Sequence, residues 1–564
     1  MAVGCAPSEA DGVSETGRTN YKLMKGVTES TVYAVESGDE NVRIHLLRVN
    51  KGAKASFKVS TAKYYKKKST KKSRKRAYKK WAKKNWGYAD VKKQAKNYQS
   101  SKDKAGQVIV ASNGDYYTHQ YNGATEGNLI MEGNKVRITN RKPFFAVLKN
   151  GDWEIRGPGA KTKDVKECVG GYLYLVHGGK LAVNKKARNV ISPRHPCQAI
   201  GITKKKDVVI ANIDGREPTS IGTSWYNLAK VMKQQGCTES IMLDGGGSAS
   251  FMTKRSKGGL KVRNTPMDGA LRAVTSAILV VKDKKARGGK IKGKAVVSMK
   301  NKKTGLKKKA GKYVYKINGR AKKTGFVNVN GKTYLFNKKG IGITKKIKIG
   351  SARYSFKKGK LKGRVVIGYC GASKGGKNLL FAYNYKKKKL DIGKNPFVKK
   401  NNGMMKNWSN QTNVPWSVEK YRIKSVAIGK GVKNIGDRFL CVTTKPFNSN
   451  LKGVKTSLRK LKLPGSLKTI GSSCIYNHYH LRKVTIPKSV RTIRSKAFYY
   501  NNRTRFTFKS GNPPKISKQA FTANKKAKRK TVFSVRGSYS WKKLMNKRSF
   551  RKRIGFSGKV KYRW

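Results

Sequence analysis

A short repeated pattern near the C-terminus constrains the fold of this chain more than any other feature. The apolar pattern of residues 423–436 recurs at 458–471 and at 481–493, and a shorter copy occupies 506–521. A unit of about 23 residues cannot bury its own apolar face, so successive units must stack on one another. The repeats therefore predict a C-terminal β-solenoid.

The residues of these repeats resemble the leucine-rich repeats of bacterial surface proteins. The run Ile486-Pro487-Lys488-Ser489-Val490, followed by Ala497-Phe498, carries the family's pattern. The resemblance covers about 423–525 and departs from the family at a longer insert, 437–457. Segments near Tyr369 and Leu390 resemble the family's N-terminal cap. We therefore expect a capped leucine-rich-repeat domain over 364–564.

Short aromatic and glycine units precede the repeats. Residues 311–363 alternate aromatic, apolar and glycine positions in the manner of consecutive β-hairpins. They resemble the cell-wall-binding and glucan-binding repeats of bacterial surface proteins. The lysine- and glycine-rich segment 286–310 is typical of a linker, and residues 1–20 are expected to be disordered.

Charge is distributed unevenly along the chain. Of 132 Lys and Arg residues, 77 lie in residues 286–564, together with only 3 of the 26 acidic residues. Because residues 286–564 have so few acidic side chains to pair with their lysines and arginines, this half of the chain must bind a polyanion, or its positive charges repel one another. The partners we expect are anionic cell-wall polymers, with nucleic acid and anionic lipid as the other candidates.

Several sequence classes are disfavoured. The seven cysteines lack metal-ligand spacing and are too sparse for a disulfide framework. No apolar run is long enough for a transmembrane helix, and no signal segment is visible. The surface-type repeats nevertheless favour an extracellular or cell-surface location.

The segment 63–104 combines lysines with seven aromatic residues. Basic and aromatic residues together can bind single-stranded nucleic acid. A solvated helical hairpin with its aromatic side chains facing inward is the interpretation that we favour.

Polar residues follow apolar strands at four places. They are Asn113 and Asp115, Arg194 and His195, Asp214 and Arg216, and Asp244. A further strand is predicted over 169–176, and a helix over 223–235 separates the last two motifs. An α+β domain over 21–285 follows, and we expect the four strand ends to converge on one pocket.

These motifs resemble those of the phosphodiester glycosidase family over about 105–282. The carrying residues are Asn113-Gly114-Asp115-Tyr116-Tyr117, Arg194-His195-Pro196, Asp214-Gly215-Arg216, Leu243-Asp244-Gly245-Gly246-Gly247-Ser248, and Asn264 to Arg272. The resemblance implies hydrolysis of a sugar-1-phosphodiester of the N-acetylglucosamine type. Gln198, with Cys197, departs from the family and affects the expected substrate preference.

The chemistry of the residue types agrees with this implication. Cleavage of a sugar C1–O bond uses carboxylates, for which we take Asp214 and Asp244, with His195 as a proton shuttle. Arginine binds phosphate in a bidentate manner, which suits Arg194, Arg216 and Arg272. Loop N–H groups can hold an anion. The full set of expected substrate-binding residues is Asn113, Asp115, Arg194, Arg216, Gly245, Gly246, Ser248, Asn264, Asp268 and Arg272.

Three functions compete at this stage. The first is a bacterial glycosidase held at the envelope by basic repeat modules. The second is a non-enzymatic adhesin that binds sugar phosphates, and the third is a nucleic-acid-binding protein, which the surface-type repeats disfavour. We expect no cofactor, although Asp115, Asp214 and Asp244 together could hold a calcium or magnesium ion.

Overall fold

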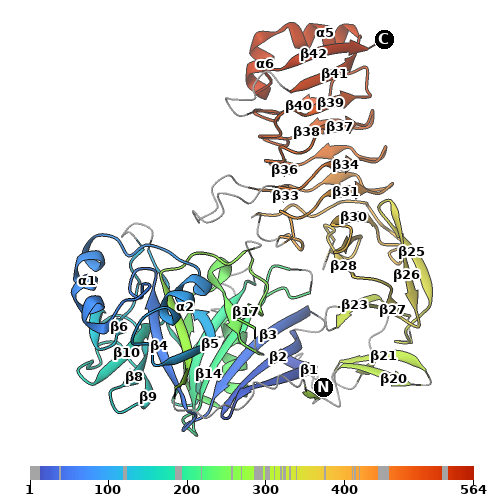
Figure 1. Cartoon of the computed structure of the whole chain (residues 1–564). Helices are drawn as coiled ribbons and strands as arrows, with labels where there is room; N and C mark the ends of the chain where they lie inside the picture. Colours follow the sequence, from blue (N-terminus) through green and yellow to red (C-terminus); the bar gives the residue numbers. More distant parts are fainter. Residues whose placement is uncertain are drawn as a thin grey trace, which may run out of the picture. The chain divides into compact units, whose positions relative to one another are not determined.

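The computed structural model resolves the chain into two compact units (Figure 1). The first unit holds most residues up to 305 and the second most residues from 306 onwards, with the short segment 216–219 grouped with the second. The boundary falls within the segment expected to be a linker. The structure describes residues 13–563 except 37–39, 119–122, 185–193, 218, 256–257, 268–269, 285–295, 299–304, 310, 318–319, 322–324, 330–331, 338, 374–375, 410, 412–413, 418, 443–455 and 524–530.

An antiparallel nine-stranded sheet forms the centre of the first unit, in the order β12-β11-β15-β13-β14-β3-β2-β1-β19. Its members are β1 (Val13–Met24), β2 (Val27–Glu36), β3 (Glu40–Val49), β11 (Tyr174–His177), β12 (Lys180–Leu181), β13 (Cys197–Thr203), β14 (Val208–Ile213), β15 (Cys237–Leu243) and β19 (Val296–Ser298). Every residue of β13 and β14 is buried, which explains their continuous apolar sequences. Because β1 begins at Val13, the expected disorder of residues 1–20 does not extend over residues 13–20.

Two five-stranded sheets complete the first unit. One has the order β17-β16-β5-β18-β4 and the other β7-β6-β10-β8-β9. Their strands are β4 (Ala55–Thr61), β5 (Gly106–Asn113), β6 (Leu129–Met131), β7 (Asn134–Arg137), β8 (Phe144–Leu148), β9 (Trp153–Arg156), β10 (Val165–Gly170), β16 (Phe251–Thr253), β17 (Lys261–Val262) and β18 (Ser276–Asp283). One core joins residues from all three sheets, among them Phe57, Phe145 and Ile200. A second core lies on the other face of the nine-stranded sheet, where α4 (Trp225–Gln234) packs.

The basic segment is helical, with α1 (Lys71–Lys84) and α2 (Val91–Gln99). Its aromatic residues Tyr64, Tyr65, Trp81, Trp86 and Tyr98 are buried. The prediction of helices with inward-facing aromatics is thus confirmed. None of the helices in the described part of the chain combines the length and apolarity needed to cross a bilayer.

The second unit begins with antiparallel strands. They are β20 (Gly305–Lys309), β21 (Lys312–Ile317), β22 (Arg320–Ala321), β23 (Gly325–Val329), β24 (Lys332–Phe336), β25 (Lys345–Ile349), β26 (Ala352–Lys357) and β27 (Lys360–Leu361). The last five form one sheet, in the order β23-β24-β27-β26-β25, around Leu335, Ile347 and Phe356. The predicted hairpins of 311–363 are therefore present.

The repeats follow and pair in parallel. Strands β28 (Val365–Tyr369), β29 (Leu379–Asn384) and β30 (Lys389–Lys394) are antiparallel, after which β31 (Ser425–Ile428) and β34 (Lys460–Lys462) add in parallel. Three further parallel ladders follow. The first comprises β32 (Asn434–Ile435), β35 (Thr469–Ile470), β38 (Thr492–Ile493) and β40 (Lys515–Ile516), and the second comprises β33 (Leu440–Cys441) and β36 (Ile475–Tyr476). The third comprises β37 (Lys483–Ile486), β39 (Arg505–Phe508), β41 (Val532–Arg536) and β42 (Lys559–Arg563). Corresponding residues face one another, as in Ile470 opposite Ile493. Two helices, α5 (Tyr539–Asn546) and α6 (Arg548–Ile554), pack near the last strands.

Candidate active site

The loop after β15 carries the sequence Asp244-Gly245-Gly246-Gly247-Ser248. A single 3-10 turn, η1 (Gly246–Ser248), follows Asp244 and Gly245, and the chain then enters β16. The loop lies between two sheets, since β15 belongs to the nine-stranded sheet and β16 to a five-stranded one. Its position at this junction explains why small residues are needed.

Two buried asparagines hold this loop in place. The Asn113 side chain donates to the carbonyl oxygen of Asp244 at 2.7 Å and accepts from the N–H of Ser250 at 2.9 Å. The Asn264 side chain donates to the carbonyl oxygen of Ala249 at 2.9 Å and accepts from the N–H of Phe251 at 2.8 Å. The side-chain amides of Asn113 and Asn264, which we expected to contact substrate, thus satisfy N–H and carbonyl groups of the loop backbone and thereby position Asp244.

Steric contact explains two of the glycines. A Cβ atom on Gly247 would lie 1.7 Å from Nη2 of Arg272, so the guanidinium rests against bare backbone. A Cβ on Gly245 would lie 2.7 Å from the carbonyl oxygen of Pro196. That same oxygen accepts a 2.7 Å hydrogen bond from the N–H of Gly246, whose φ is 58°. The bare backbone of Gly247 therefore lets Arg272 approach the loop after Asp244, and the backbone of Gly245 and Gly246 lets the Pro196 carbonyl oxygen approach it.

Asp244 is half-buried as a residue, and Ser248, Arg272 and Tyr117 surround its enclosed carboxyl group. Burial raises its pKa to about 7, although hydrogen bonds from Ser248 and the Gly245 N–H, and the charge of Arg272, act in the opposite direction. Burial and the charge of Asp244 raise the pKa of Tyr117 to about 12. A carboxyl with a pKa near 7 can act as a general acid at neutral pH.

Asp115 is a second carboxyl with a raised pKa. It is 2% exposed, and burial raises its pKa to about 7 despite a 2.6 Å hydrogen bond from the Gly127 N–H and the charge of Lys142. Its Oδ1 has no hydrogen-bond partner within the described residues. Gly127 and Gly170 pack directly against this carboxyl. Asp115 therefore lies beneath the site surface.

Asp214 occupies a different environment. Its side chain is fully buried, with Oδ2 lying 3.2 Å from Nη1 of Arg43 and 3.1 Å from Nε2 of His45. The N–H of Thr265 donates to Oδ1 at 2.6 Å. Burial would raise the pKa of Asp214, but His45, Arg43 and Thr265 together hold it below its usual value. Asp214 is thus a charged group enclosed by cationic and N–H donors.

Strand register separates the two predicted catalytic carboxyls. Strand β13 pairs with β14 so that Cys197 faces Ile213, and with β15 so that Gln198 faces Leu243. Continued by one residue, the ladders place Asp214 and Asp244 on either side of β13, roughly 10 Å apart between Cα atoms. The strand residues just before them, Ile213 and Leu243, pack into the two different cores on opposite faces of the sheet. Consistent with this geometry, none of the hydrogen-bond partners described above is shared by the two carboxyls.

The other predicted residues are placed as follows. His195 forms a β-bridge with Thr223, and both it and Arg194 are half-buried. Ser248 hydrogen-bonds Asp244 and Tyr117. Arg216 has a φ of 56° and groups with the second unit, whereas Asp268 lies outside the described residues. The roles of His195, Arg194, Arg216 and Asp268 stay predictions.

Sequence reasoning missed a group of residues near Asp244. The ring of Tyr172, which is 40% exposed, lies 5.1 Å from that of Tyr116 and 5.5 Å from that of Trp225. Lys142 Nζ lies 4.5 Å from the Tyr172 ring and pairs with Glu126. Because the chain turns at Gly171, the single strand predicted over 169–176 is wrong, and its residues divide between β10 and β11 in different sheets. That break exposes Tyr172.

Gln198, which departs from the family's pattern, has an internal function. It is fully buried, donates to the carbonyl oxygen of Asn113 at 2.6 Å, and accepts from Ser112 at 2.9 Å and from Asn212 at 2.8 Å. It therefore links β5, β13 and β14 behind Asn113. This position makes Gln198 a support of the loop clamp.

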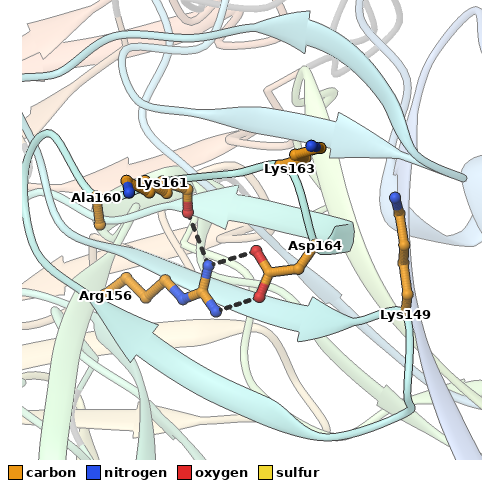
Figure 2. Close-up of a pocket in the computed structure, with 6 residues that line it drawn as sticks. All are labelled: Lys149, Arg156, Ala160, Lys161, Lys163 and Asp164. Carbon is orange, nitrogen blue, oxygen red and sulfur yellow. Dashed lines mark hydrogen bonds and ion pairs between the residues drawn. The ribbon is translucent and has the colours of Figure 1, made fainter.

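A separate basic depression lies at the edge of the β9–β10 region (Figure 2). It has a volume of about 610 Å³ and is lined by Lys149, Arg156, Ala160, Lys161, Lys163 and Asp164. Two hydrogen bonds, of 2.8 and 2.6 Å, pair Arg156 with Asp164, and they hold the pKa of Asp164 at about 2. None of the strand-end residues lines it, so it is distinct from the Asp244 site.

The sequence raised the possibility of a cation shared by Asp115, Asp214 and Asp244. Among the residues that the structure describes, no group of three His, Cys, Asp or Glu side chains gathers as a metal site would require. The separate neighbours of Asp214 and Asp244 are consistent with this observation.

Comparison with known proteins identifies two regions. Residues 106–281, from β5 to β18, match the phosphodiester glycosidase family, and residues 452–540 match the BspA type leucine rich repeat region in six copies. The SPbeta prophage-derived uncharacterized protein YomE of Bacillus subtilis (strain 168) is 32% identical over 90 residues. That stretch is 16% of this chain and only 13% of the length of YomE.

Solved structures also show similarity at low identity. The catalytic domain of zebrafish N-acetylglucosamine-1-phosphodiester alpha-N-acetylglucosaminidase, auto-inhibited by its pro-peptide, is 19% identical with a TM-score of 0.36, covering 47% of this chain and 88% of that one. A hypothetical protein from Synechocystis is 12% identical with a TM-score of 0.33, covering 48% and 64%. By its sequence matches, the chain contains a phosphodiester glycosidase family domain followed by a BspA-type leucine-rich repeat region.

Proposed function

We propose that the first unit hydrolyses a sugar-1-phosphodiester, of the N-acetylglucosamine type, at Asp244. One observation carries the proposal. Inside the family-matched segment, a carboxyl with a pKa of about 7 lies beside Arg272, whose guanidinium rests on Gly247. An acid near neutrality next to a fixed cation suits a substrate that carries a phosphate beside the bond to be broken.

The proposed reaction uses water as the second substrate. Asp244, in its protonated form, donates its proton to the oxygen that bridges C1 of the sugar and phosphorus. The C1–O bond breaks with its electron pair on that oxygen, and water adds to C1 and releases a proton. The products are a free sugar and a phosphate monoester. Arg272 and Arg194 are proposed to bind the phosphate oxygens.

Asp214 receives a different role in this proposal. A fully buried carboxylate surrounded by Arg43, His45 and Thr265 is poorly placed to touch substrate. It holds Thr265, the neighbour of the loop clamp Asn264, and we propose that it positions the site through this connection. His195 is retained as a candidate proton shuttle.

The aromatic surface beside Asp244 supports a carbohydrate substrate. Tyr172 presents an exposed ring, with Lys142 and Glu126 next to it. Amphipathic rings of this kind bury apolar sugar faces while their neighbours hydrogen-bond hydroxyl groups. We propose that the sugar stacks on Tyr172.

The setting of the activity is also a proposal. The leucine-rich repeats resemble those of bacterial surface proteins, so we propose that the enzyme is secreted or surface-attached. The parallel ladders support a stacked solenoid. The basic second half would hold the protein to anionic polymers of the envelope.

The test measures free sugar and phosphate monoester released from a panel of sugar-1-phosphodiesters by the full chain. Asp244→Asn should lower kcat by at least about 100-fold while the thermal unfolding curve stays cooperative. Asp152→Asn, which removes a carboxylate 46% exposed to solvent, is the matched control and should behave as the wild type. Equal turnover in both variants would remove Asp244 from catalysis.

A sugar-phosphate-binding adhesin is the alternative function. The enclosed supports of the site, Asn113, Asn264 and Gln198, would serve binding as well as catalysis. Tight binding of a sugar-1-phosphodiester with no product formed by the wild type would favour this second function.

A further inference from the structure

A lysine-lined groove lies within the hairpin region of the second unit. It has a volume of about 630 Å³ and is lined by residues of β20, β21, β24, β26, β27 and β28 and of the turns between them. Six of its lining residues are lysines: Lys308, Lys332, Lys357, Lys358, Lys360 and Lys362. All but Lys360, which is partly buried, are exposed.

The walls of the groove are fixed by backbone contacts. The N–H of Gly342 donates to the carbonyl oxygen of Tyr313 at 2.8 Å, and the N–H of Leu335 donates to that of Gly359 at 2.8 Å. A Cβ on Gly359 would lie 2.6 Å from the Cα of Gly342, so these two backbones touch. The strand β21 is thereby held against the β26–β27 turn. The groove is a built feature of the fold.

The charge of the groove is not neutralised locally. The sequence contains no acidic residue between Asp283 and Asp391. Asp391 is buried, and its carboxylate already binds Tyr354, Ser351 and Lys389. Within the described part of the chain, no ion pair joins any of the six lysines to a carboxylate. Six like charges around one groove repel one another unless an anion enters.

We propose that this groove binds a flexible phosphate polymer, in which a polyol phosphate chain places one negative charge on each repeat. Lysine is a mobile point charge, whereas planar bidentate recognition of phosphate is typical of arginine, which is absent from the lining. Single-stranded nucleic acid usually stacks its bases on several aromatic rings. Tyr313 is the one aromatic residue among those lining the groove. The proposal assigns a site to the envelope attachment proposed above and is independent of hydrolysis.

The expected salt dependence follows from counterion release. If six phosphates contact six lysines, affinity varies with salt to a power of roughly 4, by analogy with single-stranded nucleic acid. Raising the salt concentration from about 50 to about 200 mM should then weaken binding roughly 300-fold. Removing four of the six lysines should reduce this effect to roughly 7-fold.

The experiment measures fluorescence anisotropy of a labelled poly(glycerol phosphate) with the full chain. The groove variant carries Lys308→Gln, Lys332→Gln, Lys358→Gln and Lys360→Gln. The control carries Lys460→Gln, Lys462→Gln, Lys468→Gln and Lys483→Gln, which remove the same charge from exposed positions on the repeats. We expect the groove variant to lose affinity and salt dependence, and the control to keep both.

Equal losses in the two variants would overturn the proposal in favour of diffuse surface charge. Tighter binding of a single-stranded DNA of equal charge would also overturn it, in favour of nucleic acid. If the groove variant does not fold, the variant Lys332→Gln/Lys362→Gln, at two exposed positions, is used with Lys460→Gln/Lys462→Gln as control. Measurements repeated on Asp244→Asn separate this result from hydrolysis, because polymer binding should be unchanged there.

Discussion

Substitution of Gly247 by alanine tests whether Arg272 acts from the position that the glycine loop gives it. The new Cβ would lie 1.7 Å from Nη2 and 2.1 Å from Cζ of Arg272. Ordinary contact begins near 3.4 Å, so the guanidinium must move by roughly 2 Å. A misplacement of about 1 Å can cost about 100-fold in rate. We therefore expect kcat/KM for a sugar-1-phosphodiester to fall by at least about 100-fold.

Stability should change little in the same variant. The displaced atoms are the end of a flexible side chain, so we expect the free energy of unfolding to fall by less than about 1 kcal/mol. Gly236→Ala is a useful contrast, since its φ of 82° is strained for alanine while nothing lies within 4 Å of the new Cβ. That variant should lose about 1 kcal/mol of stability and keep its activity.

A double-mutant cycle identifies the cause. If Gly247→Ala acts by displacing Arg272, it should have no added effect in an Arg272→Ala background. Steady-state kinetics of the four proteins and their thermal unfolding provide the readouts. A further loss of kcat/KM in the double variant, or normal kinetics in Gly247→Ala alone, would refute the reasoning.

The charges and thiols support four other predictions. Because the pKa of Asp244 is about 7, kcat should fall as pH rises above about 7, and a flat profile between pH 5 and 9 would exclude a general-acid role. Because the pKa of buried Asp115 is raised to about 7 in the folded protein, the stability linked to its protonation is fully present below its unfolded-state pKa and is lost as pH rises through about 7. The free energy of unfolding of the wild type should therefore fall by about 2–4 kcal/mol relative to that of Asp115→Asn between pH 4 and 8. Denaturant unfolding at both pH values measures this difference. Asp214→Asn should cost about 3–5 kcal/mol by removing the buried carboxylate that Arg43 and His45 enclose, and a loss below 1 kcal/mol would contradict those ion pairs. In a Cys5→Ser background the six buried free thiols should react with a thiol reagent only as the protein unfolds, and rapid labelling of the folded protein would contradict their burial.

The sequence allowed the strand ends and the repeats to be predicted because both depend on local pattern. Asp244 follows an apolar run and precedes three glycines, and Ile470 and Ile493 recur at the repeat period. The helix α4 likewise follows from apolar spacing that ends at Gly236. Local pattern is sufficient for features of this kind.

Long-range pairing accounts for what the sequence did not reveal. Alternation in β3 shows that Arg43 and His45 share a face, but only the pairing of β3 with β14 brings them to Asp214. The same limit applies to Asn113, because the sequence does not show whether its amide contacts a sugar or the protein backbone. The strand register places the amide against the backbone of the Asp244 loop. The exposure of Tyr172 depends on a chain break that period-two alternation cannot indicate.

The two units differ in when their β-strands can find their partners as the chain is synthesised. Strand β4 pairs with β18, so residues 55–61 wait for residues 276–283 before their sheet is complete. In the repeats, paired strands lie only 22 to 35 residues apart in the sequence, as Lys483 and Arg505 do at one extreme and Asn434 and Thr469 at the other. Contacts distant in sequence slow folding, whereas near-neighbour stacking can proceed repeat by repeat. During synthesis the first unit must therefore remain open until its last strand has left the ribosome, while each repeat of the second can stack as soon as it emerges.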